Sequence, residues 1–75
     1  MPRLTERERQ VLKWISVGKS NWEIAKILGI SEFTVKNHVQ NLLRKLSATN
    51  RAHAVTKAIA CGLLHTTKNG VQRED

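Results

Sequence analysis

Apolar residues recur every three or four positions along most of this chain, which is the spacing of one face of an α-helix. In the longest such stretch the spacing continues without a break from Val35 to Leu46. No stretch alternates between apolar and polar residues as a half-buried strand does. We therefore expect an all-α fold, a compact four-helix domain, with helices over about residues 6–17, 21–28, 32–46 and 51–61.

Polar residues and glycines mark the predicted helix ends. Thr5 and Ser20 each stand three residues before a glutamate, the capping-box pattern in which side chain and backbone pair at a helix start. Ser31 and Asn50 are suitable N-caps for the third and fourth helices. Three of the stretches are followed by glycine, the residue that most readily takes the left-handed conformation at a helix end. These glycines are Gly18, Gly29 and Gly62.

Length and composition indicate one small domain. The 75 residues can bury only a thin core, since a chain of about 60 residues buries roughly 60% of its unfolded surface. No apolar run approaches the ~20 residues that span a membrane, and the N-terminus lacks the apolar stretch of a signal peptide. A single cysteine, Cys61, cannot build a disulfide framework. We expect a cytoplasmic domain over residues 1–65 and a polar, frayed tail over residues 66–75.

The charges are unevenly placed. Lys and Arg number 13 against six Asp and Glu, which gives a net charge of +7, and no acidic residue occurs from Phe33 to Arg73. The earlier acids stand just after predicted helix starts, where a negative charge suits the helix dipole. We interpret them as local residues that neutralise little of the later basic surface. The excess indicates an anionic partner, nucleic acid above all.

The second and third predicted helices, with a turn of about four residues containing Gly29, have the layout of a helix-turn-helix. In this unit the second helix lies in the DNA major groove and the first braces it. Opposite its apolar stripe, the third predicted helix presents Phe33, amides and cations. An ordinary solvated face is the alternative, but such faces usually include Glu. Amides and cations can bond to base edges. The candidates for reading bases are Lys36, Asn37, Gln40, Asn41 and Arg44.

Phosphate contacts are expected from the edges of this unit, where they set register without reading sequence. The start of the second predicted helix directs free backbone N–H groups outward and attracts anions. Side chains near this start, near the start of the third helix and beside the following turn can also reach phosphates. The candidates are Lys19, Ser20, Asn21, Trp22, Thr34, His38, Lys45, Asn50 and Arg51. For Trp22 the alternative is packing against the neighbouring helix, and for His38 it is a structural role.

The combination of these motifs resembles the LuxR-type (GerE-like) helix-turn-helix DNA-binding domain of bacterial transcription regulators. The resemblance is carried by Gly18-Lys19-Ser20-Asn21-x-Glu23-Ile24-Ala25, Ile30-Ser31-x-x-Thr34-Val35-Lys36, Arg51-x-x-Ala54-Val55 and Gly62-Leu63-Leu64. It implies that the third helix reads the major groove, with Lys36, Asn37 and Gln40 nearest the bases. It also implies a dimer contact on the fourth helix, where the candidates are Val55, Ala58, Ile59 and Gly62.

The resemblance implies sequence-specific binding of double-stranded DNA by a homodimer, with RNA polymerase as a further candidate partner. It also makes the chain an expected C-terminal effector domain of a longer regulator. Metal-ligand spacing and catalytic motifs are missing from the sequence, so we expect no enzyme, no cofactor, no metal and no membrane partner. Two alternatives stay open. One is a sigma-factor-like promoter-binding module, which the fourth helix disfavours, and the other is a protein-interaction module without sequence-specific DNA binding.

Overall fold

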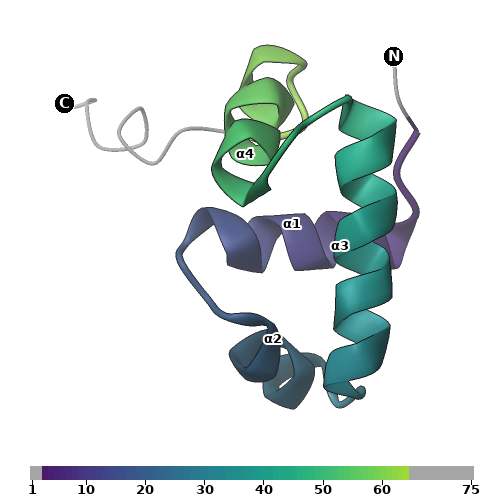
Figure 1. Ribbon diagram of the computed structural model, residues 1–75. Coiled ribbons are helices and arrows are strands. Elements are labelled where there is room, and N and C mark those ends of the chain that lie inside the picture. Colours follow the sequence, from purple (N-terminus) through teal and green to yellow (C-terminus); the bar gives the residue numbers. More distant parts are fainter. Residues whose placement is uncertain (1–2, 65–75) are drawn as a thin grey trace, which may run out of the picture.

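Three helices pack against a longer one in the computed structural model, which describes residues 3–64 (Figure 1). The elements are α1 (Glu6–Ser16), α2 (Asn21–Leu28), α3 (Glu32–Leu46) and α4 (Arg51–Ala60). The all-α prediction is confirmed, and the predicted bounds differ only at the ends of α1 and α4, by one residue each. Assignments of helix ends commonly differ by this much. The predicted tail, 66–75, lies outside the described residues.

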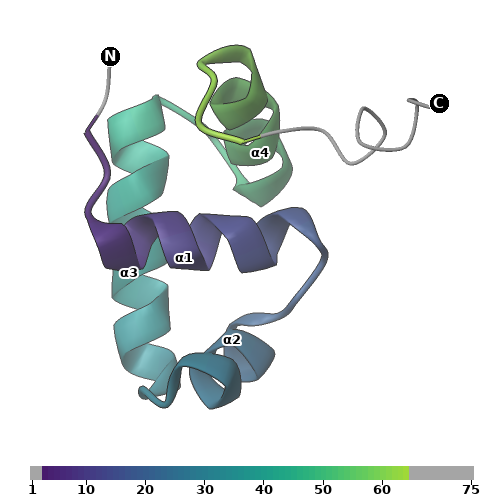
Figure 2. The ribbon, with the colours of Figure 1, turned by 180° about the vertical axis from the view of Figure 1, so that it is seen from behind.

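The long helix α3 is the axis of the arrangement. Figures 1 and 2, which view the molecule from opposite sides, both show α1 crossing the middle of α3. In both views α2 lies beside the N-terminal end of α3 and α4 lies beside its C-terminal end. Contacts join α3 to each of the other helices, and α1 also contacts α4. One side of α3 is therefore covered along its length.

Each helix begins at a side chain that accepts a hydrogen bond from the backbone, as predicted. Thr5 Oγ1 accepts from the N–H of Glu8 (3.1 Å), and Glu8 Oε1 accepts from the N–H of Thr5 (2.9 Å). Ser20 forms the same reciprocal capping box at α2, and Ser31 and Asn50 cap α3 and α4. Such caps replace hydrogen bonds that the first turn of a helix cannot make within itself.

The core forms where the apolar stripes of the four helices meet. Its largest fully buried side chains come from α1, α2 and α3, and α4 adds two alanines that have no exposed surface, Ala54 and Ala58. The large ones are Val11, Leu12, Ile24, Val35 and Leu42. Because α3 turns its apolar stripe inward, the opposite stripe of the same helix is left toward solvent.

Two turns control how α3 is placed. Gly29 ends α2 with φ 69°, and the N–H of Ile30 donates to Ala25 O (3.0 Å), so the chain turns within a few residues into α3. At the other end no glycine is present, and Ser47 takes the left-handed conformation with φ 54°. The N–H of Ala48 then donates to Leu43 O (2.9 Å), a bond that closes the last turn of the helix. The short turn after α2 keeps α2 and α3 in the helix-turn-helix relation.

Candidate nucleic-acid interface

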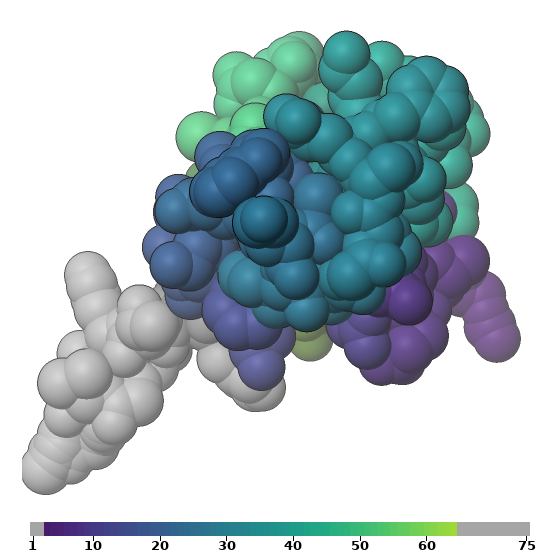
Figure 3. Space-filling model, turned by 90° about the horizontal axis from the view of Figure 1, so that it is seen from below, coloured from purple at the N-terminus to yellow at the C-terminus, as the bar shows by residue number. Residues whose placement is uncertain are grey.

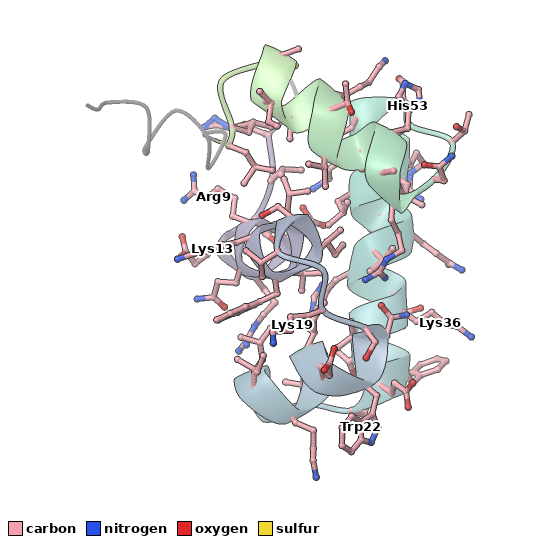
Figure 4. All side chains as sticks on the ribbon, turned by 90° about the vertical axis from the view of Figure 1, so that its left-hand side faces the viewer. Arg9, Lys13, Lys19, Trp22, Lys36 and His53 are labelled. Atoms are coloured by element: carbon pink, nitrogen blue, oxygen red, sulfur yellow. The ribbon has the colours of Figure 1, made fainter. Side chains whose placement is uncertain are left out.

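The outward side of α3 carries an exposed row at helical spacing. Phe33, Asn37, Gln40 and Arg44 follow one another at intervals of four, three and four residues, and all four are exposed. Lys36 flanks this row and points away from the ribbon (Figure 4). The only acidic residue of α3 lies in its first turn. We call these five residues, together with Asn41, the outward face of α3.

Four of the five predicted base-reading residues are exposed on this face, and Asn41 is half-buried. Arg44 Nη2 donates a hydrogen bond to Asn41 Oδ1 at 2.9 Å. The guanidinium has five N–H donors, so this bond orients it and leaves four donors available. Arg44 and Asn41 therefore form one oriented polar group near the C-terminal half of the face.

The start of α2 presents backbone donors beside α3. Ser20 N–H donates to Glu23 Oε1 (2.8 Å), and Glu23 N–H donates to Ser20 Oγ (3.1 Å). Within residues 3–64 no partner is recorded for the N–H groups of Asn21 and Trp22, the first two of the helix. Unpaired N–H groups at a helix start, together with the helix dipole, attract an anion such as a phosphate.

The carboxylate of Glu23 lies at the same helix start. The hydrogen bond from the Ser20 backbone lowers the pKa of Glu23, and the nearby positive charge of Lys19 lowers it further. Glu23 is therefore ionised at neutral pH, and Lys19 offsets its charge. With the charge of Glu23 offset, the free N–H groups and the helix dipole are the features of this helix start that suit an anion.

Arg51 joins α4 to the start of α2. Its Nη1 donates to Asn21 Oδ1 (2.5 Å) and its Nη2 donates to Lys19 O (2.7 Å). Arg51, Asn21 and Lys19 are all half-buried. The predicted phosphate ligands Arg51 and Asn21 thus bond to each other through their side chains. The structure gives these side chains a positioning role, in which α4 holds the backbone around the start of α2.

Lys45 is also engaged within the protein. Its Nζ lies 2.7 Å from Glu8 Oε1 and also donates to Arg3 O (3.2 Å), while Glu8 is only 3% exposed. Burial alone raises the pKa of Glu8, but hydrogen bonds from Lys45 and from the Thr5 backbone, with the charge of Lys45, outweigh it and lower the pKa. Lys45, a predicted phosphate ligand, is therefore already paired within the protein. Glu8 has its predicted helix-start role in the capping box with Thr5 and in addition pairs with this later basic residue.

The remaining phosphate candidates lie on α3 and in the turn before α4. Thr34 is half-buried with its Oγ1 2.9 Å from Ser31 Oγ, and His38 is half-buried on the flank of α3. Asn50 is exposed, and its Oδ1 accepts from the N–H of His53 (2.8 Å), which leaves its amide nitrogen free to donate. These positions border the outward face of α3 without lying in its exposed row.

Trp22 projects from α2 into solvent (Figure 4) and is 56% exposed. More than half of its surface is therefore available to a partner, and it is not buried against the neighbouring helix. Lys26 Nζ lies 5.0 Å from the centroid of its ring, within the range of a cation–π contact. Seen from below, α2 and the start of α3 together form the near surface of the molecule (Figure 3). Trp22 thus belongs to the same end of the domain as the start of the outward face.

The predicted dimer residues do not share one environment. Val55 and Ile59 are half-buried and Gly62 is exposed, so these three have surface available to a second copy. Ala58 has no exposed surface and lies in the core, so its side chain cannot contact another molecule. Its place in the predicted dimer contact is wrong, because the turn of α4 that carries it faces α1 and α3.

Two further features bear on the class of protein. In the part of the chain that the structure describes, no group of three or more His, Cys, Asp or Glu residues could hold a metal ion. None of the helices described is long and apolar enough to cross a membrane. The surface features that stand out are the outward face of α3, the start of α2 and the half-buried apolar residues of α4.

Known proteins resemble this chain in sequence and in fold. Transcriptional activator protein SolR of Ralstonia solanacearum is 59% identical over 61 residues, which are 81% of this chain and 26% of SolR. The structure of the transcription factor GerE has a TM-score of 0.77 and 36% identity, covering 81% of this chain and 91% of GerE. A VqmA–ligand–DNA complex of Vibrio cholera has a TM-score of 0.79 and 28% identity, covering 99% of this chain and 32% of VqmA.

The chain spans about a quarter of the length of the curated relatives it matches, 26% in the case of SolR. Residues 2–58 match the family described as bacterial regulatory proteins, luxR family. This family is one of transcription regulators and not of enzymes. The chain therefore belongs to the luxR family of bacterial regulatory proteins and forms a helix-turn-helix DNA-binding domain of the GerE type.

Proposed function

We propose that this domain binds double-stranded DNA with sequence preference, and that α3 enters the major groove. The observation that carries the proposal is the exposed row of amides and cations on α3, directly opposite its buried stripe. The major groove, roughly 12 Å wide, admits an α-helix, and α3 with its 15 residues is long enough to reach several base pairs, because a helix rises about 1.5 Å per residue.

Base reading is assigned to the outward face. Lys36 can donate to O6 and N7 of guanine, and Asn37 and Gln40 can pair with N6 and N7 of adenine. All three are exposed, and none is recorded in a side-chain hydrogen bond within residues 3–64. Arg44, oriented by Asn41, can add a contact at the far end of the row.

Phosphate contacts are assigned to the borders of that face. The N–H groups of Asn21 and Trp22, with Ser20 and the ammonium group of Lys19, would bind one phosphate at the start of α2. Thr34 and His38 border the row on α3, and Asn50 donates from the turn before α4. These contacts would fix the register of α3 in the groove, while Arg51 holds the start of α2 in place.

A homodimer through α4 is the second part of the proposal. Val55 and Ile59 offer half-exposed apolar surface, and Gly62 leaves the end of this surface without a side chain. Two copies joined there would present two α3 helices to two half-sites, and the spacing of the half-sites would follow the symmetry of the dimer. The contact surface consists of Val55, Ile59 and Gly62, without Ala58.

RNA polymerase is proposed as a further partner. The relative SolR is by name a transcriptional activator, and an activator acts by changing what the polymerase does at a promoter. Trp22 and Ile27 of α2 are 56% and 44% exposed, and large apolar side chains at a surface suit a protein contact. DNA and polymerase meet in the bacterial cytoplasm, where we place the chain.

The family match leaves no support for the sigma-factor-like alternative.

The test is a selection of bound sequences from a random duplex pool, followed by titration of the selected duplex at several salt concentrations. We expect one sequence pattern to be enriched. The affinity should fall steeply between about 50 and 200 mM salt, because binding releases counterions from the DNA. Lys13→Ala is the control variant and should bind the selected duplex as the natural chain does. Lys13 is an exposed cation, but it lies on α1 and away from α3 (Figure 4). An unenriched pool with a flat salt response would contradict the proposal and favour the protein-interaction module.

A further inference from the structure

Phe33 is 71% exposed, more than any other large apolar side chain in residues 3–64. A single exposed apolar residue is common on protein surfaces and by itself indicates nothing. Its position is what distinguishes it. Phe33 is the first residue of the exposed row on α3, four residues before Asn37 and seven before Gln40. It therefore projects in the same direction as the residues to which base reading is assigned.

The surroundings of Phe33 form a hollow of about 340 Å³, lined by Asn21, Glu32, Phe33 and Lys36. The carboxylate of Glu32 repels a phosphate, so the hollow is poorly suited to the DNA backbone. The phenyl ring offers dispersion contacts and no hydrogen bond. A neutral base edge that carries an apolar group fits this combination better than any charged group does.

Among the four bases, only thymine presents a methyl group in the major groove. We propose that Phe33 reads a thymine by packing its ring against the C5 methyl group. The inference rests on the proposed function, because it requires α3 to lie in the major groove. There the first turn of the helix enters among the base edges, and a phenyl ring that faced water in the free protein is removed from water.

Phe33 adds a base pair to the site rather than sharing one with Gln40. Seven residues of helix separate the two along the axis of α3, which is about 10 Å. Neighbouring base pairs are about 3.4 Å apart. Phe33 and Gln40 therefore face different base pairs, with Asn37 between them. Lys36 lines the same hollow as Phe33, so we assign it to the base pair next to the thymine.

The test replaces each thymine of the selected duplex in turn by deoxyuridine, which lacks only the methyl group. Affinities are measured for the natural chain and for Phe33→Ala by fluorescence anisotropy at fixed salt. We expect one position at which deoxyuridine weakens binding by the natural chain about fourfold, the value of roughly one buried methyl group. At that position we expect Phe33→Ala to bind the thymine and deoxyuridine duplexes with equal affinity, because this variant lacks the ring that contacts the methyl group. Since Phe33 is exposed, the variant is expected to fold, and circular dichroism checks this.

Val17→Ala is the matched control, because Val17 is also an exposed apolar residue but lies at the end of α1, away from the residues assigned to DNA. That variant keeps the deoxyuridine effect at the same position. If every deoxyuridine weakens the natural chain and Phe33→Ala equally, the inference is overturned while sequence-specific binding stands. If the natural chain enriches no sequence at all, the proposed function and this inference are overturned together.

Discussion

The ion pair between Glu8 and Lys45 joins the first helix to the end of the helix assigned to DNA reading. Glu8 is 3% exposed, whereas the Lys45 side chain keeps 32% of its exposure. Replacing Lys45 by Met keeps much of the packing of its aliphatic stem but leaves the buried carboxylate with the Thr5 backbone as its remaining partner. We expect this single substitution to destabilise the domain.

The size of the effect follows from the partial burial of the pair. Exposed ion pairs contribute about 0.2–1 kcal/mol. Removal of one partner from a buried pair costs about 3–5 kcal/mol. With one partner buried and the other one-third exposed, we expect Lys45→Met to lower the free energy of unfolding by about 2 kcal/mol. In a domain of this size each kcal/mol shifts Tm by about 4–8 °C.

Glu8→Gln provides the matched control. Glutamine at this position can keep the capping box with Thr5, and Lys45 can return to water, so this variant should lose only about 1 kcal/mol. In the Lys45→Met background the same substitution should stabilise the domain, because it removes an uncompensated buried charge. Urea unfolding of the natural chain, both single variants and the double variant measures this change of sign.

The pH dependence follows from the lowered pKa of Glu8. Because the pKa is lower in the folded chain than in the unfolded chain, the ionised carboxylate stabilises the fold at neutral pH. That contribution is lost as the pH falls below the pKa of the unfolded chain and through that of the folded chain. The difference in stability between the natural chain and Glu8→Gln should therefore shrink on acidification. Two results would refute this reasoning. One is that the losses of stability in Lys45→Met and Glu8→Gln simply add in the double variant. The other is that the difference in stability between the natural chain and Glu8→Gln does not change with pH.

Three other substitutions separate the roles assigned to the surface. Gln40→Ala should reduce the preference for one base pair by about 1–3 kcal/mol, measured with duplexes mutated at each position, and equal weakening on all duplexes would instead make Gln40 a phosphate contact. Arg51→Ala should weaken binding to matched and mismatched duplexes by the same factor, because it frees the start of α2 without touching a base; a changed preference would contradict the positioning role. Ile59→Glu should leave a folded monomer that binds single half-sites, as seen by analytical ultracentrifugation with and without paired half-sites, whereas unchanged cooperativity would exclude α4 as the dimer contact.

Local structure was predictable from neighbouring residues. The caps at Thr5, Ser20, Ser31 and Asn50 depend on side chains three residues from their partners, and all four are present. Ser47 was not predicted, because a residue other than glycine seldom takes the left-handed conformation and no neighbouring residue marks it. Helix starts can be predicted where a capping side chain marks them, whereas a helix end closed by backbone hydrogen bonds without a glycine has no such mark in the sequence.

Contacts between distant residues account for what the sequence did not reveal at the candidate site. Lys45 and Glu8 are 37 residues apart, and Arg51 and Asn21 are 30 residues apart, so the chain alone does not indicate that they bond to each other. From the sequence alone, a basic residue in a helix-turn-helix is interpreted as a phosphate ligand even when it is already paired within the folded protein. Ala58 was misassigned for a related reason, since the small residues of α4 do not distinguish the core side from the surface side.

The outward face of α3 was predictable, because its spacing follows from one helix and its apolar stripe. The central claim is that this face and the start of α2 meet DNA. Amide chemical shifts of the isotope-labelled chain, recorded by NMR as the selected duplex is added, test it most directly. We expect the largest changes at Asn21, Trp22 and along Phe33, Asn37 and Gln40, with Arg9 and Lys13 of α1 unchanged. Changes confined to α1, with α3 unaffected, would contradict it.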